Sequence, residues 1–163
     1  MIAVVCGNLL DAPVEALVNA VNTVGVMGKG IALPFRQAFP ENYAAYRTAC
    51  QRGDVQPGAM FVVPVQRLAG PRMIINFPTK RHWKDRSRLA DIDAGLIDLV
   101  RVVQEAQIPS IAVPALGCGQ GGLAWEVVRP RIVAAFALLP DVAVQLFAPA
   151  GELDVVARLE RAV

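Results

Sequence analysis

Residues 18–35 read VNAVNTVGVMGKGIALPF, an apolar stretch interrupted by two asparagines, three glycines and a lysine. The apolar run 16–21 predicts a strand, and the pattern from Ile31 onward predicts a helix. Glycines between them allow backbone torsions and close approaches that a side chain would prevent. A loop that joins a strand to a helix in this way presents backbone amides to an anion. We therefore expect a phosphate-binding loop; a glycine-rich turn without a ligand is the alternative.

The details of this loop narrow its ligand. Only two residues separate Gly25 from Gly28, and Gly30 follows Lys29, so the spacing is not that of a Walker A loop. ATP hydrolysis is thus disfavoured. Asn19 and Asn22 lie at the end of a buried strand, where their amides need hydrogen-bond partners. A sugar hydroxyl is one such partner.

The rest of the chain predicts one α/β domain in which helices cover both faces of a sheet. The 163 residues are 55% hydrophobic, enough for a single core. The strands are expected at residues 2–6, 16–21, 60–65, 73–77, 111–114 and 143–147. The helices are expected at 31–52 with a break near Pro40, at 88–107 with Ser87 as N-cap, at 125–139 with Pro130 in the first turn, and at 152–163. We expect the domain to end near residue 150, with 151–163 a C-terminal helix or the start of a further region.

Composition excludes several classes of protein. No apolar run reaches the roughly 18 residues of a membrane span, and the start of the chain lacks the features of a signal peptide. We therefore expect a cytoplasmic protein. The three cysteines have no CxxC spacing, so neither a zinc site nor a disulfide framework is expected. The net charge of +2 is too small to indicate nucleic-acid binding by the whole chain.

A second glycine-rich loop, residues 114–123, reads PALGCGQGGL and also lies between a strand and a helix. Gly117, Gly119 and Gly122 match G-x-G-x-x-G, the dinucleotide fingerprint, which keeps a nicotinamide-dependent oxidoreductase open. Only one strand follows, however, and Asp141 precedes that strand, whereas the fingerprint requires an acidic residue at the end of it. The other interpretation is that two glycine loops grip one diphosphate.

A third loop, INFPTKRHW at residues 75–83, carries candidate catalytic groups. Lys80 either neutralises phosphates or acts as a nucleophile whose pKa cationic neighbours such as Arg81 lower. His82, the single histidine, either transfers protons or is a hydrogen-bonded structural residue. Residues 80–88 hold five of the 16 Lys and Arg residues, which form either a functional patch or a solvated face.

Four motifs in order, each at a strand end, resemble the macrodomain family, the ADP-ribose-binding fold. They are GNLL at 7–10, VNAVNTVGVMGKGIA at 18–32, INFPTKRHW at 75–83 and PALGCGQGGLAW at 114–125. The chain is most similar to the DarG branch of DNA ADP-ribosyl glycohydrolase antitoxins, which is related to the human terminal ADP-ribose protein glycohydrolase. The resemblance implies a three-layer α/β/α sandwich with a central mixed sheet of about six strands.

The resemblance also implies roles for individual residues. Asn8 and Leu9 would contact the adenine, and Asn22 the distal ribose. Lys80 corresponds to the catalytic lysine, with His82 or a substrate phosphate handling protons. The human relative also uses an aspartate, but this chain has Gly121 at that place. The remaining residues expected to bind ADP-ribose are Asn19, Thr23, Gly28, Lys29, Gly30, Ile31, Thr79, Leu116, Gly117, Cys118, Gly119, Gln120, Gly121, Gly122 and Leu123.

The substrate implied by the resemblance is thymidine ADP-ribosylated in single-stranded DNA, without a cofactor and without a membrane. The toxin that makes this modification, a DarT-type DNA ADP-ribosyltransferase, is the implied protein partner. The basic run would then track the strand through Arg81, Lys84, Arg86 and Arg88, with Trp83 as a stacking face. Two alternatives remain: a binding module that recognises ADP-ribose without cleaving it, and an antitoxin that works by burying its toxin.

Overall fold

Six strands form one mixed sheet in the computed structural model, which describes residues 1–152. The strand order is β1-β6-β5-β2-β4-β3, and only β3 runs antiparallel to its neighbour. The strands are β1 (Ile2–Val5), β2 (Ala16–Val21), β3 (Phe61–Pro64), β4 (Met73–Pro78), β5 (Ser110–Val113) and β6 (Ala143–Phe147). The helices are the short 3-10 helix η1 (Leu9–Asp11), α1 (Ala32–Ala38), α2 (Pro40–Gln51), α3 (Leu89–Glu105) and α4 (Trp125–Phe136).

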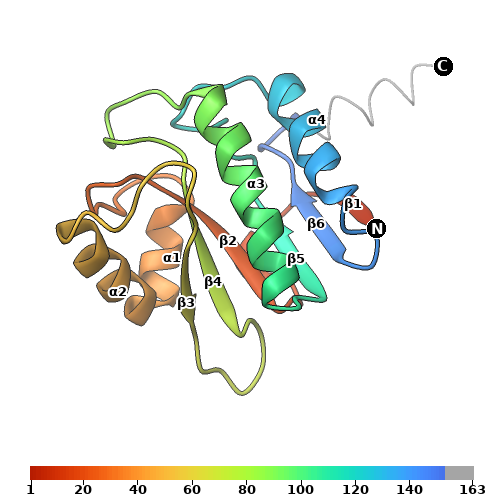
Figure 1. Ribbon diagram of the computed structural model, residues 1–163, viewed down its shortest axis with the longest axis horizontal. Helices are drawn as coiled ribbons and strands as arrows, with labels where there is room; N and C mark the ends of the chain where they lie inside the picture. Colours follow the sequence, from red (N-terminus) through yellow and green to blue (C-terminus); the bar gives the residue numbers. More distant parts are fainter. Residues whose placement is uncertain (153–163) are drawn as a thin grey trace.

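Helices cover both faces of this sheet, which confirms the predicted three-layer sandwich (Figure 1). The side chains of each strand alternate between the two layers, as the pleat requires. In β2, Ala16 and Val18 pack in the core beneath α3 and α4, whereas Leu17 packs with Phe35 of α1 on the other face. Because both faces are covered, β2 is an almost continuous apolar run, the pattern from which it was predicted.

Two details of the predicted helices are wrong. Ser87 does not cap α3: the N-cap is Arg88, which makes no side-chain capping bond, and the buried Ser87 hydroxyl has no hydrogen-bond partner within residues 1–152. Pro130 lies inside α4 rather than in its first turn, because the helix already begins at Trp125. The predicted break near Pro40 is confirmed, since α1 ends at Ala38 and α2 begins at Pro40. Apart from Glu152, the helix expected at 152–163 lies outside the described residues.

Candidate functional site

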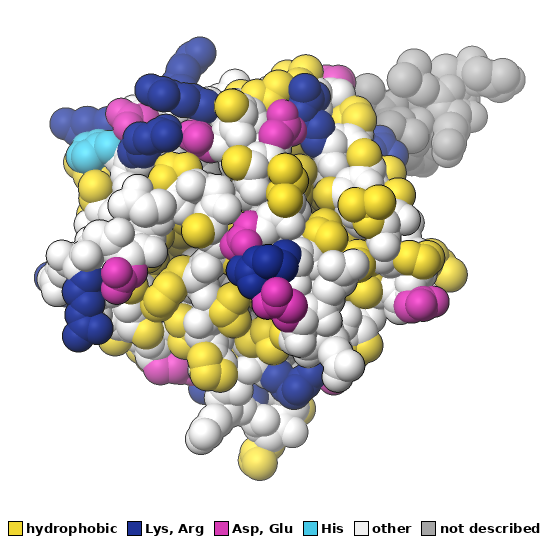
Figure 2. All heavy atoms as spheres, in the orientation of Figure 1, with side chains coloured by type: hydrophobic (Ala, Val, Ile, Leu, Met, Phe, Trp, Pro, Cys, Tyr) yellow, Lys and Arg dark blue, Asp and Glu magenta, His cyan; other side chains and the backbone are white. Residues whose placement is uncertain are grey.

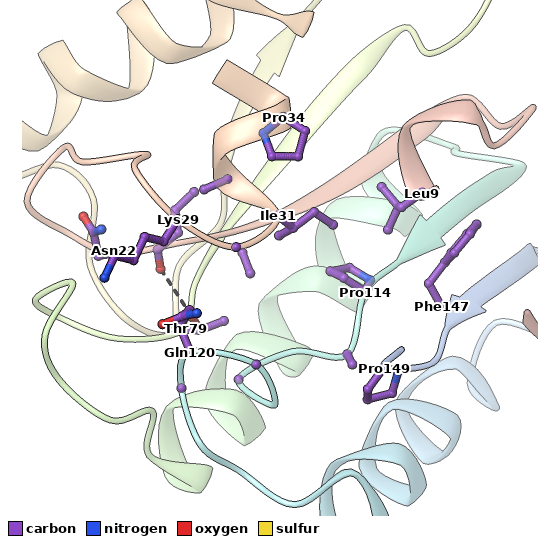
Figure 3. A pocket seen from close by; sticks show the side chains of 18 of the residues that line it. Leu9, Asn22, Lys29, Ile31, Pro34, Thr79, Pro114, Gln120, Phe147 and Pro149 are labelled. Atoms are coloured by element: carbon purple, nitrogen blue, oxygen red, sulfur yellow. Dashed lines mark hydrogen bonds between the residues drawn. The ribbon is translucent and has the colours of Figure 1, made fainter. Parts of the chain in front are cut away.

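A cavity of about 740 Å³ opens at the edge of the sheet where the parallel strands end (Figure 3). The loops after β1, β2, β4, β5 and β6 all contribute to its wall, as expected where the carboxyl ends of parallel strands meet. Its lining includes fourteen of the predicted site residues. They are Asn8, Leu9, Asn22, Gly28, Lys29, Gly30, Ile31, Thr79, Lys80, Trp83, Gly117, Gly119, Gln120 and Gly121.

One end of the cavity is an apolar slot. The slot is formed by side chains from three segments that are far apart in the sequence: Leu9, Ile31 with Pro34, and Phe147 with Pro149 (Figure 3). An apolar lining of this kind suits an aromatic group such as a purine. Phe147 and Pro149 were not predicted, although their position at the carboxyl end of the last parallel strand was a usable signal.

The side-chain amide of Asn8 forms hydrogen bonds with residues of its own turn. Its Oδ1 accepts the Leu10 N–H at 3.2 Å, and its Nδ2 donates to Asp11 at 3.1 Å. Asn8 thereby caps the short helix η1, which carries Leu9 into the slot.

Asn22 stands at the other end of the cavity with its amide held in one orientation. Its Oδ1 accepts hydrogen bonds from the N–H groups of Val24 (3.1 Å) and Val26 (3.4 Å) and from the Tyr46 hydroxyl (2.8 Å). Its Nδ2 donates to the Val26 carbonyl at 2.7 Å. The oxygen is therefore saturated, and what Asn22 retains for a ligand is the second N–H of its amide.

Tyr46 is a residue of this site that sequence reasoning missed. It is fully buried in α2, and its single hydroxyl proton is shared between the backbone oxygen and the Oδ1 of Asn22, each 2.8 Å from the hydroxyl oxygen. Burial raises the pKa of Tyr46, with a further contribution from Cys50, so the phenol stays protonated and acts as a donor. No local sequence pattern links a helix residue to a loop 24 positions away.

The first glycine loop is fixed by Met27, whose side chain is fully buried beneath it. Gly28, Lys29 and Gly30 follow on the cavity side, so the Lys29 cation stands at the wall. The loop is also tied to the next one: Thr23 donates its backbone N–H and its hydroxyl to the Arg81 carbonyl, at 3.1 and 2.8 Å. Thr23 does not line the cavity and instead holds two of its loops together.

The second glycine loop folds back on itself around Gly117, which has a φ of +73° and accepts the Leu123 N–H at 2.9 Å. Gly117, Gly119, Gln120 and Gly121 line the cavity. Leu116, Cys118, Gly122 and Leu123, which were also predicted to bind ADP-ribose, lie outside its lining. Burial raises the pKa of the Cys118 thiol to about 11, so it is not a reactive thiolate.

Gly121 leaves no room for the carboxylate that the human relative uses. A Cβ atom at Gly121 would stand 2.2 Å from the Ser87 Oγ and 2.5 Å from the Gly117 carbonyl oxygen. Distances this short require the backbone or Ser87 to move. No carboxylate can therefore be placed at this position without such a movement.

Lys80 faces into the cavity from the loop after β4, with its ammonium 3.1 Å from the Trp83 carbonyl oxygen. Burial lowers the pKa of Lys80 and the Lys29 cation lowers it further, while Asp85 acts in the opposite direction. The expectation that Arg81 lowers this pKa is not supported, since Arg81 is paired with Asp91 at 2.7 Å. Lys29 takes that role because both lysines stand at the same cavity.

His82 lies outside the cavity lining. Its Nδ1 accepts the Lys84 N–H at 3.1 Å, and its backbone N–H donates to Asp85. Its ring lies 5.0 Å from that of Trp83. In this structure His82 shapes the turn that carries Trp83, the structural alternative that the sequence had left open.

Asn19 is not at the cavity, contrary to the prediction. It is completely buried and donates from its amide to Asn76 at 3.3 Å. Asn76 in turn exchanges two hydrogen bonds with Asn42 of α2, at 2.8 and 3.1 Å. This asparagine cluster joins β2, β4 and α2 beneath the first glycine loop and gives the Asn19 Nδ2 a partner, whereas among residues 1–152 the Asn19 Oδ1 is buried without one.

The basic run 80–88 divides over two cavities. Trp83, which is 43% exposed, lines the main one, and the Lys84 ammonium lies 4.9 Å above its ring. Arg81, Arg86 and Arg88 line a smaller recess of their own. Figure 2 shows lysine and arginine side chains gathered beside the histidine at one corner of the molecule.

Two further features are absent from residues 1–152. No group of three or more His, Cys, Asp or Glu side chains there is placed to hold a metal ion. Among these residues, moreover, no helix has both the length and the apolar character that a membrane span requires.

The family model and the curated relatives that match this chain point to the same protein family. The Macro domain model matches residues 18–132. The chain is 58% identical to a DNA ADP-ribosyl glycohydrolase of Mycobacterium tuberculosis over 151 residues, 93% of this chain and 43% of that protein. It is 56% identical to the protein of the same name from Thermus aquaticus over 149 residues, 91% of this chain and 41% of that protein. The chain thus spans less than half the length of these curated relatives.

Solved structures agree with the sequence match. The macrodomain of Mycobacterium tuberculosis DarG superposes with a TM-score of 0.91 at 58% identity, covering 92% of this chain and 99% of that one. Thermosipho africanus DarTG in complex with ADP-ribose superposes with a TM-score of 0.85 at 33% identity, covering 93% and 42%. On the family match, the sequence identity and the superposition together, the chain belongs to the Macro domain family.

Proposed function

We propose that this chain is a DNA ADP-ribosyl glycohydrolase that removes ADP-ribose from thymidine in single-stranded DNA. The names of its relatives support the reaction. The observation that carries the proposal is Lys80, an amine of lowered pKa in the wall of the same cavity that contains the apolar slot and both glycine loops.

ADP-ribose fits the cavity in one direction. The adenine occupies the slot beside Leu9, Ile31 and Phe147, and the diphosphate lies between the two glycine loops. The distal ribose then reaches Asn22, whose remaining N–H donates to a ribose hydroxyl. This orientation places C1'', the atom that carries the modified base, on the side of Lys80. The complex of the Thermosipho africanus relative with ADP-ribose supports ADP-ribose as the ligand.

The fourteen predicted residues in the lining form this binding site, with Lys80 and Trp83 at its outer end. Thr23, Leu116, Cys118, Gly122 and Leu123 support the loops from behind, and Asn19 supports them through the asparagine cluster.

The chemistry follows from Lys80 as nucleophile. Its neutral amine attacks C1'' and forms a C–N bond while the bond from C1'' to the thymine breaks, with the electron pair leaving on the base. The base takes up a proton, and water then hydrolyses the lysine adduct and restores the amine. A substrate phosphate is better placed than His82 to handle these protons, because His82 lies outside the cavity.

A DarT-type DNA ADP-ribosyltransferase is the proposed partner of the native protein. One relative, 33% identical over 91% of this chain, is a fusion of a DNA ADP-ribosyl transferase and a DNA ADP-ribosyl glycohydrolase in Thermosipho africanus. A fusion places the two activities in one molecule, which supports an antitoxin that removes the modification made by its partner.

The second candidate is a reader that binds ADP-ribose without cleaving it. It is favoured by the hydrogen bond from Lys80 to the Trp83 carbonyl, which occupies the amine, and by the missing carboxylate at Gly121. A nicotinamide-dependent oxidoreductase is not proposed, because within residues 1–152 only β6 follows the second glycine loop and its helix.

The deciding experiment measures release of ADP-ribose from a thymidine-ADP-ribosylated oligonucleotide by the native chain, Lys80→Ala and Lys80→Arg. Arginine keeps the positive charge, but because it stays protonated it cannot act as a nucleophile. Lys80→Arg therefore separates the effect of the charge from that of the nucleophile. Release by the native chain alone supports the glycohydrolase. Binding of ADP-ribose by all three without release by any identifies a reader, and release by Lys80→Arg at the native rate refutes the nucleophile.

A further inference from the structure

The loop 80–88 presents different side chains to its two sides. Lys80 and Trp83 face the ADP-ribose cavity. Arg81, Arg86 and Arg88 instead line a second recess, of about 310 Å³, to which Asp85 and Ser87 also contribute. The two linings have no residue in common. The arginines are therefore not part of the site that holds the diphosphate of ADP-ribose.

The recess and the cavity stand back to back. The Ser87 N–H donates to the Gly121 carbonyl at 2.9 Å, and Gly121 lines the cavity while Ser87 lines the recess. One backbone hydrogen bond thus joins the two linings, so the recess lies close to a strand attached to a ligand in the cavity.

The recess carries uncompensated positive charge. Arg86 and Arg88 are exposed, and within residues 1–152 neither forms an ion pair. Arg81 is paired with Asp91, and the Asp85 carboxylate accepts the His82 N–H instead of meeting an arginine. The recess also lies where the 17-residue helix α3 begins without a side-chain cap, and the helix dipole adds positive potential there.

We propose that this recess binds one backbone phosphodiester of the single-stranded DNA that flanks the ADP-ribosylated nucleotide. The inference rests on the proposed function, which places the modified base at Lys80 and Trp83. Guanidinium groups bind phosphate oxygens through paired hydrogen bonds, and a phosphodiester carries one negative charge, close to the net charge left in the recess. In this arrangement the Trp83 ring stacks on one base of the strand. Arg86 and Arg88 bind the next phosphate along the same strand.

The first experiment compares two substrates, an ADP-ribosylated thymidine nucleoside and the same nucleoside within a single-stranded oligonucleotide. For the double variant Arg86→Gln/Arg88→Gln, the ratio of kcat/KM for the oligonucleotide to that for the nucleoside should fall roughly ten- to hundredfold. Arg101→Gln is a control for the loss of a positive charge far from the recess, since Arg101 lies about 20 Å along α3 from Arg88 at 1.5 Å rise per residue. Its ratio should stay at the native value.

A second experiment identifies the phosphate. Oligonucleotides with one neutral methylphosphonate linkage, on either side of the modified nucleotide, remove single charges from the strand. At one linkage, the methylphosphonate should lower kcat/KM of the native chain by the same factor as the double substitution does. The same methylphosphonate should leave kcat/KM of the double variant unchanged. For an unmodified oligonucleotide, the slope of log K against log salt should decrease by about 0.7 in the double variant, the value for one phosphate of a single strand.

Three outcomes would overturn the proposal. The first is a double variant whose ratio of kcat/KM for the oligonucleotide to that for the nucleoside equals the native ratio. The second is a double variant in which a methylphosphonate at any linkage lowers kcat/KM further. The third is a double variant that binds unmodified DNA with the native affinity and the native salt dependence. If the native chain cleaves neither substrate, the proposed function fails, but binding of the unmodified oligonucleotide still decides the recess.

Discussion

The hydroxyl of Tyr46 offers a direct test of how the site is held in place. In Tyr46→Phe the ring remains and only the donor to Asn22 is removed. The described contacts leave the backbone oxygen of Asn22 without its partner, whereas Oδ1 keeps the N–H groups of Val24 and Val26. One buried acceptor without a partner costs about 1–3 kcal/mol of unfolding free energy. For a domain of this size that corresponds to a melting temperature lower by roughly 2 to 10 °C.

The same variant should weaken ADP-ribose binding modestly. The Asn22 amide loses one of the three donors that hold its oxygen, so the Kd should rise about two- to tenfold, the effect of one net hydrogen bond. Isothermal titration calorimetry and thermal unfolding measure the two effects. Tyr43→Phe is the matched control: it is the same change on the same helix, and no hydrogen bond of the Tyr43 hydroxyl is seen, so its effect should stay within about 0.5 kcal/mol. The reasoning fails if Tyr46→Phe is no less stable than Tyr43→Phe, or if its Kd equals the native value.

Other predictions concern the glycine loops and the lysines. Neutral Lys80 is the nucleophile, so kcat/KM should rise with pH through the lowered pKa of Lys80. Lys29→Gln removes a cation that lowers this pKa, and the midpoint of the pH profile should move upward; a midpoint that stays in place or moves down would exclude the coupling. Gly121→Asp should not restore a second acid but should lower stability by several kcal/mol in chemical denaturation, because its Cβ meets Ser87 Oγ and the Gly117 carbonyl. A stable, more active Gly121→Asp would contradict this account. Ser87→Ala should be neutral or stabilising in the same assay, since the hydroxyl it removes is buried without a partner; a loss above about 1 kcal/mol would indicate a bond not seen here.

Local patterns in the sequence were enough to predict the layers and the main loops of the site. The run 16–21 is buried on both faces and matches β2 to the residue, and the stepping of apolar residues over 88–107 matches α3 closely. The glycines of 25–30 and 117–122 mark loops at strand ends, and parallel strands bring those ends to one edge. The hydrophobic period of a segment depends only on residues close together in the sequence, so it can be recognised without knowing which segments pack against it.

Which way individual side chains point was decided by the tertiary structure alone. Asn19 and Asn22 carry the same amide, yet one is held by Asn76 beneath the site and the other stands at the cavity. In the irregular loop 80–88, Lys80 enters the cavity while Arg81 turns to Asp91 and the recess. Such a loop has no repeating geometry, so the direction of each side chain depends on contacts with segments distant in sequence. Chain composition therefore determines which chemical groups are present, and long-range packing determines which of them meet the ligand.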